Sequence, residues 1–175
     1  PADETEAVKA VRAALELNGP VYIRFGRLAV PVIFDDDYNF EVGKGVELRS
    51  GCDVTVIATG LMVNEALEAY ELLKAEGISA RIINMATIKP LDNEIVLKAA
   101  RETGAIVTAE EHSVIGGLGG AVCELLAGEC PVPVVRLGVY DTFGHSGPAP
   151  ALLDEFGLRA VNIVEKAKQA LSMKK

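Results

Sequence analysis

Short apolar runs rich in β-branched residues alternate along the chain with longer segments in which apolar residues recur at helical spacing. The short runs predict strands buried on both faces of a sheet, at residues 54–58, 81–85, 105–109 and 132–139. A less apolar run at residues 46–49 predicts an edge strand. The stripes with a period near 3.6 predict helices at residues 61–76, 92–103, from about 118, at 150–156 and at 162–171.

Because strands and helices alternate, the sequence predicts one α/β fold. We expect a three-layer α/β/α sandwich with a mostly parallel sheet of about five strands and one antiparallel edge strand. Glycines and prolines stand between the periodic segments, where turns are needed. Gly60, Gly77 and Gly104 are expected to separate strands from helices.

The first 27 residues predict one further helix and one further strand. Asp3 and Glu6 have the spacing of a capping box at the start of the helix, and residues 20–24 form a short apolar run that predicts the strand. One helix and one strand cannot bury their apolar faces alone. We therefore interpret residues 1–27 as the tail of a domain, residues 28–39 as a linker, and residues 40–175 as the main domain.

The linker is polar, with Pro31, Asn39 and three consecutive aspartates at residues 35–37. A run of aspartates could hold a cation, but no further oxygen ligands are spaced around it. We favour a charged linker.

Composition narrows the classes of partner and the compartment. The chain has 175 residues and a net charge of −8, and half of its residues are apolar. A chain with this much negative charge repels nucleic acid and anionic membranes, and we therefore expect neither as a partner. No apolar run is long enough to span a bilayer. Three widely spaced cysteines form no C-x-x-C pair and fit a reducing cytoplasm.

The chain opens at Pro1 with no initiator methionine and no basic-then-apolar leader. We expect a processed or excised piece, or further residues before it.

A glycine-rich turn at residues 116–120 follows a predicted strand and opens a predicted helix, which is the context of a nucleotide-binding loop. Its spacing does not fit, because Val122 stands where a third small residue would have to be. We favour a tight turn with close packing at the start of the helix over nucleotide binding.

Glu110, Glu111 and His112 lie just past a predicted strand, at the edge where functional groups gather in parallel sheets. Adjacent side chains on an extended segment point in opposite directions, so the two glutamates are not a paired acid and base. We favour hydrogen bonds that hold loops or a subunit interface. His145 stands beside Ser146, but adjacent residues rarely face each other as base and nucleophile.

Two arginines, Arg24 and Arg27, flank Phe25 and Gly26 after the first predicted strand. The planar donor fork of arginine matches a phosphate, and it equally suits an interdomain ion pair with a carboxylate. The sequence leaves both interpretations open. Two histidines and scattered acidic residues predict no metal site, and no catalytic set is visible in the chain.

Several stretches resemble the C-terminal domain of the thiamine diphosphate-dependent transketolase family, namely residues 53–60, 84–92 and 107–119. The same domain occurs in deoxyxylulose-phosphate synthases and in the beta subunits of 2-oxo-acid dehydrogenases. Residues 141–147 and 152–157 resemble transketolase most, particularly its two-subunit form. The family often has glutamate where this chain has His145, so the resemblance assigns that residue no role.

The resemblance implies that residues 1–27 end the pyrimidine-binding domain and that residues 40–175 are the C-terminal domain. Thiamine diphosphate and Mg would then be bound by the missing N-terminal portion and not by this chain. Of the family's substrate contacts, Arg27 alone matches, as the arginine that binds the sugar phosphate. The complete enzyme would transfer a two-carbon ketol unit between sugar phosphates, and the chain alone would be inactive.

The implied partners are an N-terminal transketolase section or subunit and a second copy of the chain in a homodimer. The candidates for the interface are Glu110, Glu111, His112, Phe143 and His145. One alternative is the C-terminal domain of a 2-oxo-acid dehydrogenase beta subunit or of a deoxyxylulose-phosphate synthase. Another is a non-catalytic dimerisation or docking module.

Overall fold

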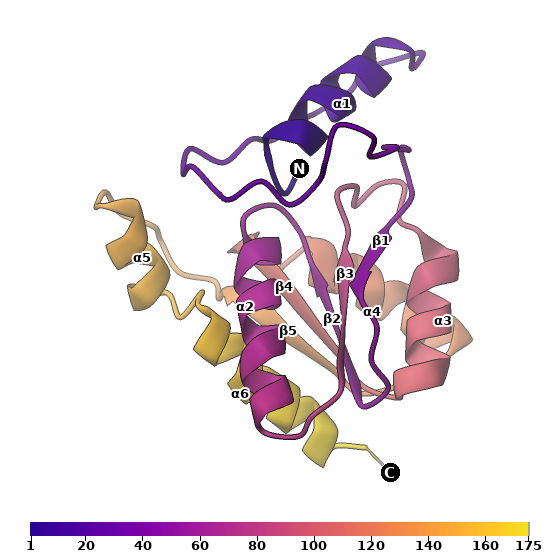
Figure 1. Cartoon of the computed structure of the whole chain (residues 1–175), viewed down its shortest axis with the longest axis vertical. Coiled ribbons are helices and arrows are strands. Elements are labelled where there is room, and N and C mark those ends of the chain that lie inside the picture. Colours follow the sequence, from indigo (N-terminus) through magenta and orange to yellow (C-terminus); the bar gives the residue numbers. More distant parts are fainter. Residues whose placement is uncertain (175) are drawn as a thin grey trace.

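A five-stranded sheet forms the middle layer of the protein, with the strand order β1-β3-β2-β4-β5 (Figure 1). The structure is a computed structural model and describes residues 1–174. Neighbouring strands are parallel except β1, which pairs antiparallel with β3 at one edge. The predicted fold class is therefore confirmed. The strands are β1 (Val46–Arg49), β2 (Val54–Ala58), β3 (Ala80–Asn84), β4 (Ile106–Ser113) and β5 (Val134–Val139).

Helices cover both faces of this sheet, which is why β2 and β3 are buried along their whole length. One face carries α2 (Met62–Ala75) and α6 (Ala160–Ser172), and the other carries α3 (Asn93–Thr103) and α4 (Leu118–Glu129) (Figure 1). The short α5 (Ala149–Glu155) precedes α6. None of the helices within residues 1–174 has the length and apolar character needed to cross a bilayer.

Helix ends follow local capping chemistry. The Asp92 side chain accepts a hydrogen bond from the Ile95 amide at 3.2 Å at the start of α3, and Gly104 ends that helix with φ 67°. The start of α6 is capped from another helix, because the buried Glu65 of α2 accepts from the Ala160 amide at 2.7 Å. The helices of the main domain thus stand where the sequence predicts them.

The strand predicted at residues 20–24 is not formed. This run has no strand partner within residues 1–174, because the five strands of the main sheet pair only with one another. Such a run becomes a strand only when another backbone segment pairs with it. The preceding helix, α1 (Glu4–Leu15), does form; its last residue, Leu15, is 80% exposed, and Tyr22 after the helix is 87% exposed.

A buried polar junction ties α1 to the main domain. The carboxylate of Glu6 is fully buried and accepts from the Tyr38 hydroxyl at 2.9 Å and from Asn84 Nδ2 at 2.7 Å. Its other oxygen accepts from the Ala2 amide at 2.6 Å, one residue before the amide that a capping box would use. Burial, aided by the Glu6 charge, raises the pKa of Tyr38 well above its ordinary value, so its hydroxyl remains a donor.

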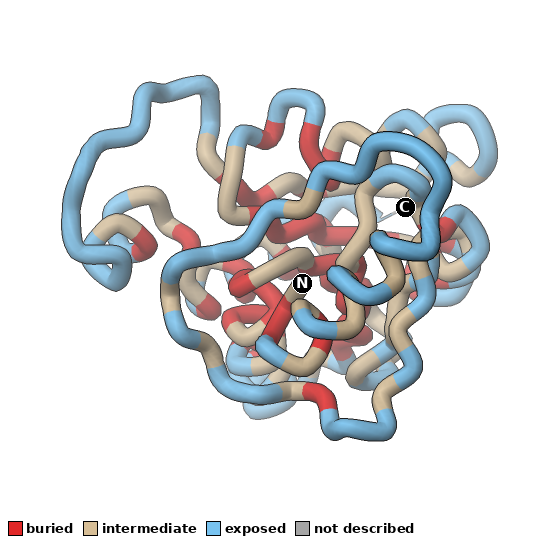
Figure 2. Tube along the Cα trace, turned by 90° about the horizontal axis from the view of Figure 1, so that it is seen from above, coloured by how far each residue is buried: buried red, intermediate tan, exposed pale blue. Residues whose placement is uncertain are grey.

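The linker is only partly solvated. Its three aspartates at 35–37 are exposed, as predicted, but Phe34 is buried and stacks on Tyr38 with 3.9 Å between ring centroids. The Phe34 amide donates to Asp3 Oδ2 at 2.8 Å. Seen from above, most of the chain between α1 and β1 is exposed, whereas the N-terminus lies over the buried centre (Figure 2).

Candidate functional site

The second half of β4 contains a bulge at the C-terminal edge of the parallel sheet. Ala109 pairs with Leu137 and Ser113 with Val139, so residues 110–112 of β4 stand opposite Gly138 alone. On the other side, β2 ends opposite Ala109. Glu110, Glu111 and His112 were expected just past the strand, but β4 runs on to Ser113 because pairing with β5 resumes there. Bulges of this kind re-aim side chains.

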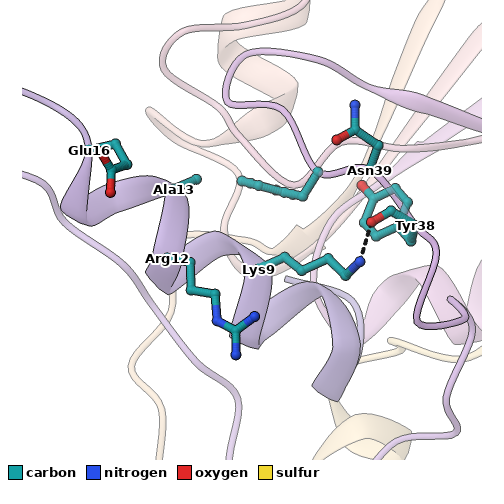
Figure 3. A pocket seen from close by; sticks show the side chains of 7 residues that line it. Lys9, Arg12, Ala13, Glu16, Tyr38 and Asn39 are labelled. Carbon is teal, nitrogen blue, oxygen red and sulfur yellow. Dashed lines mark hydrogen bonds between the residues drawn. The ribbon is translucent and has the colours of Figure 1, made fainter.

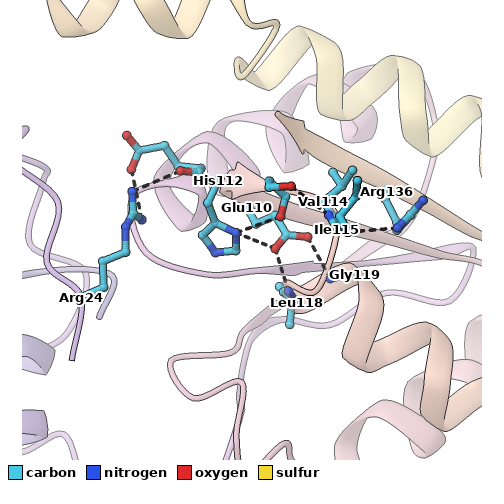
Figure 4. A network of polar contacts seen from close by, with 10 residues as sticks. Arg24, Glu110, His112, Val114, Ile115, Leu118, Gly119 and Arg136 are labelled. Atoms are coloured by element: carbon cyan, nitrogen blue, oxygen red, sulfur yellow. Dashed lines mark hydrogen bonds and ion pairs between the residues drawn. The ribbon is translucent and has the colours of Figure 1, made fainter. Parts of the chain in front are cut away.

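Glu110 points inward from this bulge and is fully buried. Its two carboxylate oxygens accept from the Leu118 amide at 2.7 Å and from the Gly119 amide at 2.9 Å, at the start of α4 (Figure 4). The positive end of a helix stabilises a negative group at this place. The anion-binding position at the start of α4 is therefore occupied by a side chain of the chain itself.

We call the contact of the Glu110 carboxylate with the Leu118 and Gly119 amides the Glu110 anchor. The glycines around the Glu110 anchor leave room for its side chain. A Cβ on Gly117 would lie 2.0 Å from Glu110 Oε2, and a Cβ on Gly138 would lie 2.9 Å from the main-chain oxygen of His112. A Cβ on Gly119 would lie 2.7 Å from the Arg136 side chain. Close packing at the start of the helix, the favoured interpretation of the glycine-rich turn, is confirmed.

His112 completes the anchor. Its Nδ1 lies 2.9 Å from Glu110 Oε2, and its side chain is 28% exposed (Figure 4). The hydrogen bond to Glu110 raises the pKa of His112 above its ordinary value, against the opposing effect of burial. Glu110 thus fixes the orientation of the imidazole and favours its protonated form.

Glu111 points the other way and meets the first segment of the chain. Arg24 Nη1 lies 3.8 Å from the Glu111 carboxylate, and Arg24 Nη2 donates to the Glu111 main-chain oxygen at 3.3 Å (Figure 4). Of the two arginines, Arg24 is therefore the one that makes an interdomain ion pair. Arg27 is exposed and has no hydrogen bond or ion pair within residues 1–174.

The loop between β5 and α5 presents aromatic side chains to solvent. Phe143 is 98% exposed and Tyr140 is 52% exposed. His145 Nε2 lies 2.8 Å from Glu155 Oε1 in α5, and this contact raises the pKa of His145. Its Nδ1 faces the main-chain oxygen of Ser146 and not the hydroxyl, so the two residues do not form a base and nucleophile.

A shallow hollow of about 330 Å³ lies between α1 and the linker (Figure 3). One of its two basic residues, Lys9, already donates to the main-chain oxygens of Asp36, at 2.6 Å, and of Tyr38. Its lining consists of Lys9, Arg12, Ala13, Glu16, Tyr38, Asn39 and Phe40.

Sequence reasoning did not identify the bulge or the contact between Arg24 and Glu111. One signal could have indicated the bulge, since a glycine inside a strand often marks such an irregularity, and Gly138 lies inside β5. No sequence signal pairs Arg24 with Glu111, which lies 87 positions away.

The model of the family "Transketolase, C-terminal domain" matches residues 43–163. The chain is 47% identical over 174 residues to the 6-deoxy-6-sulfo-D-fructose transketolase subunit of Clostridium sp. (strain MSTE9), covering 99% of this chain and 54% of the relative. It is 43% identical over 172 residues to the 1-deoxy-D-xylulose-5-phosphate synthase of Heliobacterium modesticaldum, covering 97% of this chain and 27% of the synthase.

A solved structure described as a split gene transketolase, inactive beta4 tetramer, superposes with a TM-score of 0.97. The two sequences are 52% identical, and the likeness covers 100% of this chain and 57% of the other. This chain therefore spans about half of the transketolase subunits it matches, and a smaller share of the synthase.

Proposed function

This chain belongs to the transketolase family as a C-terminal section, and on that premise we propose that it completes a thiamine diphosphate-dependent transketolase. The complete enzyme transfers a two-carbon ketol unit from a ketose phosphate to an aldose phosphate. One observation carries the proposal, namely that 99% of this chain matches about half of a transketolase subunit. The other half is supplied by residues or chains beyond the sequence given.

We assign residues 1–27 to the end of the pyrimidine-binding domain, residues 28–39 to the linker and residues 40–175 to the C-terminal domain. The unpaired run at residues 20–24 supports this division, because it is mostly apolar but pairs with no strand in the described chain. The exposed apolar side chains of Leu15 and Tyr22 support it as well, since a missing domain body would cover them.

Thiamine diphosphate supplies the carbanion chemistry of such an enzyme when it is bound. Within residues 1–174, no three His, Cys, Asp or Glu side chains gather as metal ligands, and Glu110 fills the anion position at the start of α4. These residues do not fit a diphosphate with its metal. We therefore assign that site to the N-terminal portion.

Arg27 is the residue we assign to substrate binding. Arg24 is engaged with Glu111, whereas Arg27 is exposed and has no carboxylate partner in the described chain. A free guanidinium suits the dianion of a sugar phosphate, because it can donate two parallel hydrogen bonds.

We further propose that the chain self-associates through residues of the C-terminal edge and the β5–α5 loop. The 98% exposed side chain of Phe143 supports this, because aromatic residues are enriched in protein–protein interfaces. Three other interface candidates also have partly exposed side chains, namely Glu111, His112 and His145. Glu110, in contrast, is fully buried and bound within the chain. The split gene transketolase that this chain resembles was solved as a beta4 tetramer.

Reconstitution tests the proposal. The chain, a partner polypeptide carrying the N-terminal portion, thiamine diphosphate and Mg²⁺ are mixed, and ketol transfer between sugar phosphates is followed. We expect activity only when both polypeptides are present. A complex that forms but neither transfers a ketol unit from any ketose phosphate tested nor makes deoxyxylulose phosphate would leave only a docking role.

A second candidate function is that of a deoxyxylulose-phosphate synthase, favoured by the 43% identity over 97% of this chain. The same reconstituted complex distinguishes the two functions. Formation of deoxyxylulose phosphate without ketol transfer would favour the synthase.

A further inference from the structure

The first segment touches the main domain at one polar point beyond α1. Among residues 18–27, Arg24 alone has a hydrogen bond or an ion pair to the main domain within the described chain. Its two terminal nitrogens contact two different groups of Glu111, the carboxylate and the main-chain oxygen. A fork held at two points fixes direction better than a single contact does.

The acceptor side of this contact is unusually well fixed. Residues 110–112 belong to the bulge and have no ladder partner, so the main-chain oxygen of Glu111 is free to accept from Arg24. The preceding residue, Glu110, is fully buried and bound to two amides of α4, at 2.7 and 2.9 Å. Since Glu110 is locked inward, Glu111 must point outward toward the first segment.

We propose that Arg24 is a positioning residue that holds the segment carrying Arg27 against the bulge of β4. The two arginines are three positions apart in the chain, so their Cα atoms lie within roughly 11 Å of each other. Glu111 neutralises Arg24 and leaves Arg27 as the free cation, which gives the two arginines different tasks. The inference rests on the proposed role of Arg27 toward a phosphate dianion.

The kinetic test uses the reconstituted enzyme with phosphorylated and non-phosphorylated acceptors. Arg24→Ala should raise the apparent KM for phosphorylated acceptors about threefold to tenfold, the loss expected of one exposed ion pair and one charged hydrogen bond. Glu111→Gln keeps the main-chain acceptor and removes only the ion pair, so it should raise this KM by less. We expect kcat to change little, and the double variant to be no worse than Arg24→Ala. Arg24→Lys should recover part of the loss.

A control variant removes another ion pair, one whose carboxylate is more exposed than that of Glu111. Glu94→Gln breaks the contact with Lys44, which measures 3.2 Å, and should leave both KM values unchanged. Raised KM values for both acceptor classes, or an equal effect of Glu94→Gln, would overturn the positioning role.

Two further results separate this inference from the proposed function. If Arg27→Ala raises KM for phosphorylated acceptors while Arg24→Ala and Glu111→Gln do not, the positioning role of Arg24 is wrong and the phosphate role of Arg27 stands. If Arg27→Ala has no effect, the phosphate role of Arg27 fails. The positioning role of Arg24 is then tested on this chain alone, by measuring NMR order parameters for residues 22–27. The order parameters should fall in Arg24→Ala and not in Glu94→Gln. Unchanged order parameters in Arg24→Ala would refute the positioning role.

Discussion

At the scale of single residues, one bulge gives two neighbouring glutamates opposite environments. Glu110 is fully buried and bound to the start of α4, whereas Glu111 faces outward and meets Arg24. His112 shares the inward side with Glu110 at 2.9 Å. Neither glutamate is paired with the other, so the edge of the sheet is organised by anchoring contacts and not by an acid–base couple.

The Glu110–His112 contact should make stability depend on pH. The folded state raises the pKa of His112 above its ordinary value of 6.5, so the protonated form stabilises the fold below that pH. This contribution is lost as the pH rises through the folded pKa. His112→Asn should therefore flatten the fall in the free energy of unfolding above pH 6.5, measured by urea titration at several pH values.

The control is His145→Asn, which removes a histidine whose contact with Glu155 is solvent-exposed and screened. We expect His145→Asn to change the pH dependence of the free energy of unfolding less than His112→Asn does. Equal pH dependence in the two variants would argue against a special role of the buried Glu110–His112 contact.

Arg27 should matter for the phosphate and not for the fold. Losing a hydrogen bond from a charged group costs roughly 1.5–3 kcal/mol, so Arg27→Ala should lower kcat/KM for sugar phosphates about ten- to a hundredfold. Arg27→Lys should recover only part, because an ammonium cannot reproduce the planar fork. Steady-state kinetics on both acceptor classes measures this, with a melting curve alongside. Equal losses for non-phosphorylated acceptors would contradict a phosphate role.

At the scale of elements, the start of α4 and the glycines around it form one unit with the end of β4. The turn at residues 116–120 has the appearance of a nucleotide-binding loop, yet its amides bind the chain's own Glu110. The junction of α1 with β3 is built on the same principle, because the buried Glu6 accepts from Asn84. In both places a buried carboxylate is satisfied by donors from another element.

Alanine substitutions separate the packing role of these glycines from helix propensity. Gly117→Ala brings a Cβ to 2.0 Å from Glu110 Oε2 and should destabilise the protein by about 1–3 kcal/mol through overpacking. Gly120 lies in α4 with open space around it, so Gly120→Ala should be neutral or stabilising by up to about 1 kcal/mol. Urea titration of both variants measures the change in the free energy of unfolding. Equal changes in the two variants would contradict the steric explanation.

We expect residues 40–175 to fold cooperatively without residues 1–39, because all five strands and the helices α2 to α6 lie in that range. The melting temperature should nevertheless be lower than that of the full chain. Ala2 and Phe34 belong to the main apolar core, and Asn84 would lose its Glu6 partner. Calorimetry of the two chains measures this. A molten, dye-binding product would show that α1 is essential to the core.

At the scale of the whole molecule, a sheet covered by helices is joined to a first segment with exposed apolar side chains. The sheet of the main domain is covered on both faces, whereas Leu15 and Tyr22 of the first segment remain exposed. The three cysteines are free. The exposed segment and the Phe143 loop are the surfaces where we expect the N-terminal portion and further copies to bind.

Alone, the chain should self-associate but neither bind thiamine diphosphate tightly nor turn over ketose phosphates. Sedimentation at increasing concentration should show assembly that weakens in Phe143→Ser, because that side chain is 98% exposed in the single chain. Calorimetry with thiamine diphosphate and Mg²⁺ should show no micromolar binding. A strict monomer that also ignores the N-terminal portion, or tight cofactor binding, would contradict these expectations.

The sequence by itself determined the elements of the main domain and their class of arrangement. Burial on both faces makes β2 and β3 continuously apolar, and the caps at Asp92 and Gly104 act over a few residues, so such signals are local and readable. The parallel sheet then follows from the alternation of strands and helices and the handedness of their connections.

Only the tertiary structure decided the features that depend on distant partners. The bulge at residues 110–112 arises from where β2 ends and where pairing with β5 resumes, and neither is encoded near Glu110. Asn84 meets Glu6 across 78 positions, and Arg24 meets Glu111 across 87. The run at residues 20–24 has strand-like residues but no edge to join, because a strand exists only when another backbone satisfies its hydrogen bonds.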